Sequence, residues 1–172
     1  MRRAAPWVLL ASLLASCAGE RAEPAKGTGP AGPAPPEVAR PYDEGADAQA
    51  QIDAALASAQ ADHRRVLLVF GANWCPWCRR LEYVLRNDPG VTSALARGYH
   101  LVHVDVGPRE SSTNRDVARR YGDPLANGLP CLVVLDPDGS VVHVQETGAL
   151  EDGDHHDPAR VVAFLDRYAA AG

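Results

Sequence analysis

The apolar positions from residue 47 onward fall into blocks whose period switches between that of a helix and that of a strand. Residues 47–62 place Ile52, Leu56 and Ala59 at helical spacing, which predicts an amphipathic helix. The run 66–70 is continuously apolar, as expected of a strand that is covered on both faces. A second helix is expected from Cys75 until the breaker sequence at residues 88–90.

The second half of the chain continues the alternation. We expect a short helix over 91–96, followed by a strand over 99–106 that is covered on both faces and whose two histidines are strand residues and not ligands. A helix capped by Ser112 or Thr113 is expected to run to Tyr121. After a loop over 122–128, strands 132–135 and 141–145 form a hairpin around a tight turn at residues 136–139. A last helix is expected to start at Asp157. The strongly periodic part of the chain therefore predicts an α/β domain.

The first 42 residues have a different composition. Residues 1–16 have two arginines directly after Met1 and continue with an apolar stretch that is too short to span a bilayer, as in a secretory signal peptide. Residues 17–42 are rich in proline, glycine and alanine without an apolar period, which predicts a flexible linker. The folded domain is therefore expected over 43–172.

The end of the predicted signal peptide suggests a lipid anchor. Residues 14–17 read Leu-Ala-Ser-Cys and resemble the lipobox of bacterial lipoproteins, in which the cysteine is lipidated and becomes the new N-terminus. Acyl chains on Cys17 would hold the protein on a membrane without crossing it. Alanine, and not aspartate, follows Cys17, which by resemblance to known sorting favours the periplasmic face of the outer membrane. An ordinary signal peptide that leaves a free cysteine is the alternative.

Composition and charge exclude some classes of function and of fold. The 172 residues carry a formal net charge of −5 without a basic stripe, which argues against a nucleic-acid partner. The four cysteines are Cys17, Cys75, Cys78 and Cys131. They are too few for a disulfide-stapled scaffold, and their positions suggest separate roles.

The candidate chemistry lies at Trp74-Cys75-Pro76-Trp77-Cys78, where the apolar strand meets the second helix. Cys75 falls at the N-cap and Pro76 at the first helical position, so unpaired N–H groups and the helix dipole favour an anion on an exposed Cys75 sulfur. Cys78 lies one turn on, within reach of a disulfide. Arg79 and Arg80 are expected to add positive charge, and Trp74 and Trp77 to offer flat apolar surfaces to a partner. The pattern predicts dithiol–disulfide exchange.

Metal binding is the main alternative for this cysteine pair, but a zinc site needs four ligands. The sequence has no second Cys-x-x-Cys pair, and its histidines are scattered. The cluster over 151–157 contains acidic residues and two histidines. We expect it to be a solvated loop, with a metal site as the less favoured alternative. For the Cys75–Cys78 pair, a structural disulfide is the remaining alternative.

These pieces together resemble the thioredoxin superfamily. The resemblance rests on the apolar strand that leads into residues 74–78, the strand that ends at Asp105, and Gly128-Leu129-Pro130 before the hairpin. It implies a thioredoxin fold with a central four-stranded mixed sheet flanked by helices and an extra N-terminal helix. The resemblance is nearest to bacterial thioredoxin-like lipoproteins and to the C-terminal domain of DsbD-type reductases.

The resemblance also assigns roles to residues outside the motif. Pro130 matches a cis-proline beside the disulfide, which leaves the backbone of Leu129 free to pair with a substrate. The acidic residue that thioredoxin has in the preceding strand is Val69 here, so Glu82 is expected either to accept the proton of Cys78 or to be a solvated helix residue. Cys131 is expected to be a buried small side chain or, alternatively, a third redox thiol.

The predicted function is that of an extracytoplasmic, membrane-anchored thiol–disulfide oxidoreductase whose only redox group is the Cys75–Cys78 pair, without another cofactor. The resemblance favours a reductant or isomerase over an oxidant. Expected partners are protein thiols or disulfides outside the cytoplasm and a membrane or periplasmic electron donor. A copper metallochaperone that uses both cysteines and a histidine, and a non-catalytic interaction domain, are the alternatives.

Overall fold

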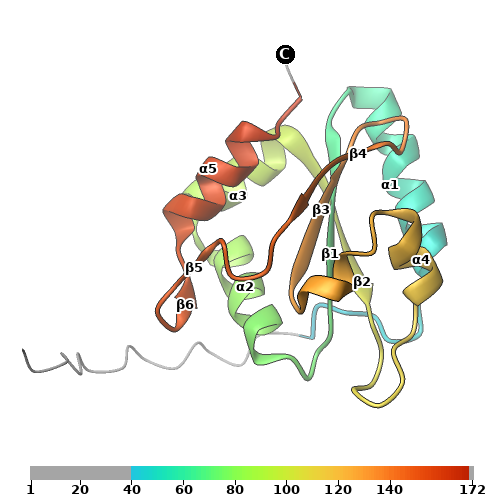
Figure 1. Ribbon diagram of the computed structural model, residues 1–172. Coiled ribbons are helices and arrows are strands. Elements are labelled where there is room, and N and C mark those ends of the chain that lie inside the picture. The colour runs from blue at the N-terminus through green and yellow to red at the C-terminus, as the bar shows by residue number, and fades with distance from the viewer. Residues whose placement is uncertain (1–39, 171–172) are drawn as a thin grey trace, which may run out of the picture. The chain divides into compact units, whose positions relative to one another are not determined.

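The computed structural model describes residues 40–170, which form one α/β domain (Figure 1). The predicted signal peptide, Cys17 and the linker up to residue 39 lie outside the described residues. The helices are α1 (Ala48–Asp62), α2 (Pro76–Asn87), α3 (Pro89–Gly98), α4 (Arg115–Arg120) and α5 (Pro158–Arg167). The strands are β1 (Arg65–Gly71), β2 (Tyr99–Asp105), β3 (Cys131–Leu135), β4 (Val141–Gln145), β5 (Glu151–Asp152) and β6 (His155–His156).

The main sheet has four strands in the order β2-β1-β3-β4. Strand β1 pairs in parallel with β2 and antiparallel with β3, and β4 closes the sheet antiparallel to β3. The sheet is therefore mixed, and with α1 preceding β1 it has the predicted thioredoxin architecture. Within residues 40–170, no helix has the length and apolar character that crossing a membrane requires.

Alternation along β1 builds two cores, one on each face of the sheet. Val66, Leu68 and Phe70 point toward α1 and α4, whereas Leu67 and Val69 point toward α2, α3 and α5. Figure 1 shows these two sets of helices on opposite sides of the sheet. All five side chains are buried, which explains why the run is apolar without a break.

The structure corrects several local expectations. Strand β2 lies at the edge of the sheet, and its Leu101 is exposed, so this strand is not covered on both faces. Helix α4 begins after Asn114, which has a left-handed backbone (φ 57°), and neither Ser112 nor Thr113 caps it. The expected loop over 122–128 contains a short 3-10 helix, Pro124–Asn127. The expected solvated loop over 151–157 contains the β5–β6 hairpin, in which His156 is buried.

Candidate functional site

The cysteine pair lies where β1 ends and α2 begins, as the sequence predicts. Cys75 is the N-cap of α2, Pro76 is its first residue, and the backbone N–H of Cys78 donates a hydrogen bond of 3.2 Å to the Sγ of Cys75. Both thiols are free. Cys75 is only 5% exposed and Cys78 1%, which corrects the expectation of an exposed first sulfur. A partner must therefore reach Cys75 through the side chains that surround it.

Hydrogen bonding gives the two sulfurs opposite acidities. The thiol of Cys78 donates to the sulfur of Cys75 and, with the backbone N–H groups of Cys78 and Trp77 and the charge of Arg109, lowers the pKa of Cys75 to about 7 against the effect of burial. The same hydrogen bond, burial and the charge on Cys75 raise the pKa of Cys78. Cys75 is thus the sulfur that ionises first, and Cys78 holds the proton.

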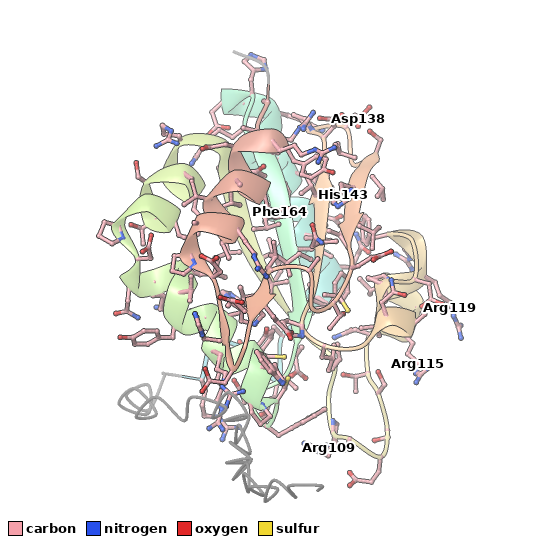
Figure 2. All side chains as sticks on the ribbon, turned by 60° about the vertical axis from the view of Figure 1, so that its left-hand side comes forward. Arg109, Arg115, Arg119, Asp138, His143 and Phe164 are labelled. Atoms are coloured by element: carbon pink, nitrogen blue, oxygen red, sulfur yellow. The ribbon has the colours of Figure 1, made fainter. Side chains whose placement is uncertain are left out.

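Arg109 was not predicted from the sequence, which pointed instead to Arg79 and Arg80. It comes from the loop between β2 and α4, and its guanidinium lies 4.2 Å from the ring centre of Trp74. The indole N–H of Trp74 donates to the carbonyl of Gly107 in the same loop at 2.7 Å. Figure 2 shows Arg109 extending from this loop, with Arg115 on the neighbouring α4. Two segments that are far apart in sequence therefore meet beside Cys75.

A small pocket of about 160 Å³ opens next to this contact. Its lining combines apolar residues with two arginines and a serine: Trp74, Val106, Pro108, Arg109, Ser112, Arg115, Leu125 and Leu129. Trp74 is 36% exposed, so part of its ring is free for contact. Trp74 and Leu129, two of the three residues expected to meet a substrate, therefore line one pocket, whereas Trp77 does not line it.

On the other side of the motif, Trp77 packs against the β5–β6 hairpin. Its ring makes an edge-to-face contact with His156 at 5.5 Å between centres, and the Nε2 of His156 hydrogen bonds to the carbonyl of Trp77 at 3.2 Å. Burial, together with the charge of nearby Arg80, lowers the pKa of His156, and the backbone carbonyl only partly offsets this effect. Arg80 itself stacks over Trp77 at 4.7 Å, whereas the arginine whose charge lowers the pKa of Cys75 is Arg109.

Glu82 lies behind the cysteines and is only 2% exposed, so it is not a solvated helix residue. Its carboxylate bonds to the Nε2 of His103 at 2.6 Å and pairs with Arg86. Burial alone would raise the pKa of Glu82, but His103 and Arg86 outweigh it and lower the pKa. His103, expected as an ordinary strand residue, is thus the partner of a buried carboxylate. Whether Glu82 accepts the proton of Cys78 stays a hypothesis.

Residues before the third strand complete the site. The Leu129–Pro130 peptide bond is cis, as the resemblance implied. Cys131 is fully buried, and its Sγ lies 3.0 Å from the carbonyl oxygen of Pro124 and also contacts that of Gly128. Burial raises the pKa of Cys131 to about 11, which makes it a poor nucleophile near neutral pH. These properties fit the buried small side chain better than a third redox thiol.

Tyr42 is a residue of the site that the sequence reasoning missed, because it was expected at the end of the linker. It is 3% exposed and packs with Cys75 and Cys78. Asn73, just before the motif, holds its backbone through two hydrogen bonds: the N–H of Tyr42 donates to Oδ1 at 3.2 Å, and Nδ2 donates to the carbonyl of Tyr42 at 2.8 Å. The folded structure thus begins before the predicted boundary at residue 43.

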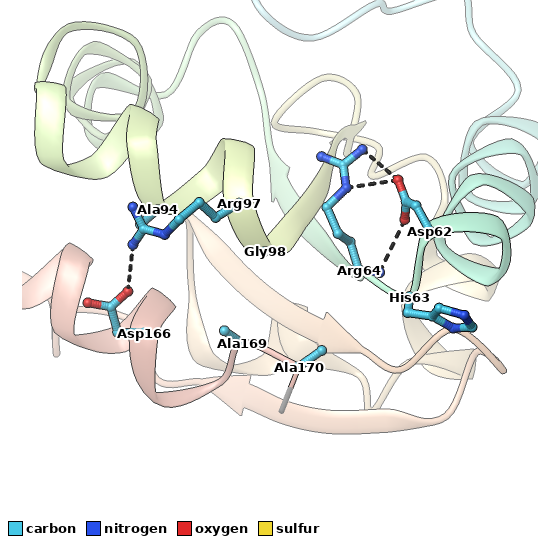
Figure 3. Close-up of a pocket in the computed structure, with 9 residues that line it drawn as sticks. All are labelled: Asp62, His63, Arg64, Ala94, Arg97, Gly98, Asp166, Ala169 and Ala170. Atoms are coloured by element: carbon cyan, nitrogen blue, oxygen red, sulfur yellow. Dashed lines mark hydrogen bonds and ion pairs between the residues drawn. The ribbon is translucent and has the colours of Figure 1, made fainter. Parts of the chain in front are cut away.

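A larger cavity of about 590 Å³ lies at the start of β1, away from the cysteines that follow its end (Figure 3). Its charged residues pair with one another, Arg64 with Asp62 at 2.8 Å and Arg97 with Asp166 at 3.2 Å. Arg64 also donates to the carbonyl of Ala96, near the end of α3. These contacts pair the four charged side chains of the cavity wall, which also contains His63.

Side chains that could bind a metal ion are not clustered in the described part of the chain. There, no group of three or more His, Cys, Asp or Glu side chains is arranged to hold a metal ion. The histidines nearest the cysteines have other contacts, since His103 bonds to Glu82 and His156 bonds to the carbonyl of Trp77.

A mixed four-stranded sheet with a cysteine pair at the start of the helix after its central strand defines a thioredoxin-fold protein with a dithiol site. A family model described as thioredoxin-like matches residues 47–137, more than half of the sequence, and the chain belongs to this family. The predictions of the superfamily and of the fold class are thereby confirmed.

Solved structures and curated proteins add closer relatives. A disulphide isomerase from Xylella fastidiosa Temecula1 is 37% identical, with a TM-score of 0.67, and the match covers 75% of this chain and 96% of that one. The C-terminal domain of DsbD from Neisseria meningitidis, at 21% identity and a TM-score of 0.51, has the same fold. The thiol:disulfide interchange protein DsbD 2 of Pseudomonas aeruginosa is 33% identical over 105 residues. These residues are 60% of this chain but only 17% of that protein.

Proposed function

We propose that this protein is a thiol–disulfide oxidoreductase that acts through Cys75 and Cys78. The observation that carries the proposal is the placement of Cys75 at the N-cap of α2, where it accepts the N–H of Cys78 at 3.2 Å. This arrangement favours a thiolate at Cys75 near neutral pH and keeps Cys78 protonated beside it. The relatives named as a disulphide isomerase and as a thiol:disulfide interchange protein support the same chemistry.

The exchange takes two steps in which atoms and electrons balance. The thiolate of Cys75 attacks one sulfur of a partner disulfide, forming a mixed disulfide, and the other partner sulfur leaves as a thiolate. Cys78 then gives up its proton and attacks the Sγ of Cys75. The mixed disulfide breaks, the partner's second sulfur leaves with a proton, and Cys75 and Cys78 are joined. The partner gains two electrons and this protein loses them, while the reverse sequence oxidises a partner.

Substrate contact is proposed at the pocket beside Trp74. Cys75 is nearly covered, so a partner has to approach along an exposed neighbour, and the exposed part of Trp74 adjoins this pocket. Leu129, which also lines the pocket, is suited to backbone pairing with an extended segment. Arg109 and Arg115 would favour a partner with acidic residues next to its disulfide.

The direction and the place of the reaction are also proposals. The similarity to a protein named a disulphide isomerase favours a reductant or isomerase over an oxidant. The signal-like residues 1–16 and the lipobox that ends at Cys17 support a lipid-anchored protein outside the cytoplasm, on the periplasmic face of an outer membrane. Its partners there would be protein thiols or disulfides and an electron donor in the membrane or periplasm.

Reduction of insulin by dithiothreitol tests the proposed activity. The full chain is expected to shorten the lag before the insulin B chain precipitates, whereas Cys75→Ser should leave the lag at that of dithiothreitol alone, because the attacking sulfur is gone. Cys131→Ala is the matched control and should behave like the natural chain, since Cys131 is buried with a raised pKa. A folded natural chain with no effect on the lag would refute the proposal.

A further inference from the structure

Resting on the proposed function, we propose that the hydroxyl of Tyr42 donates a hydrogen bond to the thiolate of Cys78 when that sulfur attacks Cys75. The segment before α1 would then supply a catalytic group to a site otherwise built from β1 and α2. The proposal concerns the second step of exchange alone. The first step belongs to Cys75, which has its own donors in the backbone of α2.

The hydroxyl of Tyr42 and the sulfur of Cys78 lie close together. Tyr42, Cys75 and Cys78 form one buried cluster, with Trp77 and Leu129 packed around it. Gly71, the last residue of β1, leaves room for the contact. A Cβ at Gly71 would lie 2.3 Å from the hydroxyl oxygen of Tyr42 and 2.8 Å from the Sγ of Cys78. Hydroxyl and sulfur thus both lie close to the same point, over a residue without a side chain.

The hydroxyl of Tyr42 is free to donate a hydrogen bond. Its oxygen is buried and has no hydrogen-bond partner of normal geometry among residues 40–170, although it lies near enough to the Sγ of Cys78 for a weak hydrogen bond between them to act against the raised pKa of Cys78. Buried polar groups are rarely left unpaired, because each one costs roughly 1–3 kcal/mol. The Cys78 sulfur beside this hydroxyl must become negative during the reaction. A hydroxyl that then donates to the thiolate would account for an unpaired polar group at this buried position.

The role of donor follows from the surroundings of Tyr42. Burial, and next the nearby charges of Cys78, Glu82 and Cys75, raise the pKa of Tyr42 well above its ordinary value. The phenol therefore keeps its proton and cannot act as a base for Cys78. Its backbone is held by the two hydrogen bonds to Asn73, and its ring makes an edge-to-face contact of 5.3 Å with His103.

The chemistry needs such a donor because Cys78 is the less acidic sulfur. The hydrogen bond to Cys75 and, next, burial raise the pKa of Cys78 in the dithiol form. When Cys75 is bonded to a partner, its charge is gone, and Cys78 must release its proton to become the nucleophile. That proton leaves with the partner's sulfur, and the new S–S bond replaces the mixed disulfide. A hydrogen bond from Tyr42 stabilises the thiolate of Cys78 between these events.

Single-turnover kinetics of Tyr42→Phe test the proposal. The full chain is mixed with a disulfide-bonded peptide, and the release of the first and second peptide thiols is followed by rapid quenching. Tyr42→Phe should slow release of the second thiol about tenfold or more, since a hydrogen bond to a charged group is worth roughly 1.5–3 kcal/mol. It should also shift the pH profile of this step upward. In the Cys78→Ser background, the first release should not change.

Tyr121→Phe is the matched control, because it removes a hydroxyl from a buried tyrosine outside the sulfur cluster and should change neither step. Thermal unfolding checks that Tyr42→Phe is folded, which we expect because the variant loses only an unpaired polar atom. A folded Tyr42→Phe chain that releases the second thiol at the natural rate overturns the proposal, as does equal slowing of both steps. A natural chain that releases neither thiol refutes the proposed function itself.

Discussion

Cys78→Ser is expected to stop the reaction after its first step and to leave partners covalently attached to Cys75. The serine hydroxyl is not a nucleophile at neutral pH, so the mixed disulfide has no internal route of escape. Cys131 should not replace Cys78, because it is buried with a pKa of about 11 and its sulfur contacts backbone carbonyls. Non-reducing electrophoresis followed by mass spectrometry should find adducts that dithiothreitol releases.

Two controls make this capture specific. The double variant Cys75→Ser/Cys78→Ser retains Cys17 and Cys131 and should capture nothing, which excludes adducts through either of them. Cys78→Ser/Cys131→Ala should capture as much as Cys78→Ser alone. If adducts appear only after Cys131 is also removed, Cys131 is a third redox thiol. If neither Cys78→Ser nor Cys78→Ser/Cys131→Ala captures a partner while folded, exchange through Cys75 is contradicted.

Gly71→Ala is expected to destabilise the domain and to slow exchange together. The added Cβ would lie 2.3 Å from the hydroxyl oxygen of Tyr42, 2.6 Å from its ring and 2.8 Å from the Sγ of Cys78, distances that packed atoms do not tolerate. Overpacking of this kind costs about 1–3 kcal/mol, and here the strain falls on the resolving sulfur. Urea denaturation measures the first effect, and turnover in the insulin assay measures the second.

Gly98→Ala is the matched control for this substitution. Gly98 is the last residue of α3, and a Cβ there would meet Ala169 at 3.5 Å, which is an ordinary contact. Alanine also favours the helix more than glycine does. Gly98→Ala should therefore keep or raise the urea midpoint and leave turnover unchanged. A Gly71→Ala chain that unfolds at the same urea concentration as the natural chain would contradict the packing described around Cys78.

The sequence predicted those parts of the fold that follow from local chemistry. The continuous apolar run in β1, the proline at the start of α2 and the cap at Asp157 act within a few residues of themselves, so the order of elements and the place of Cys75 could be foreseen. The edge position of β2 could not, because strand order depends on pairings between distant segments.

The surroundings of the cysteines were harder to predict, since three of their neighbours come from distant segments. Tyr42 lies before α1 in a stretch whose composition resembles a linker. Arg109 is one arginine among several, and only the fold of the β2–α4 loop brings it over Trp74. His156 sits in an acidic stretch that suggested a solvated loop. In each case, a long-range contact outweighs the local pattern.

The resemblance to the family identified Glu82 as a candidate residue but could not predict its contacts. Its position in the motif helix made it a candidate for proton transfer, and its burial supports a special role. Its bond to His103 depends on the parallel pairing of β1 with β2, which the sequence could not specify residue by residue. The described contacts of Glu82 are with His103 and Arg86, so its link to Cys78 stays open to test by Glu82→Gln.

The central claim is that the start of α2 holds Cys75 as a thiolate near neutral pH. Thiolate absorbance in the ultraviolet, followed against pH for the reduced chain and for Cys75→Ser, isolates this sulfur by difference near neutral pH, where burial keeps Cys78 and Cys131 protonated. The difference should titrate with a midpoint near 7, the lowered pKa of Cys75, with the thiolate present above that pH and lost below it. A midpoint near 9, the ordinary value for a cysteine thiol, would contradict the account.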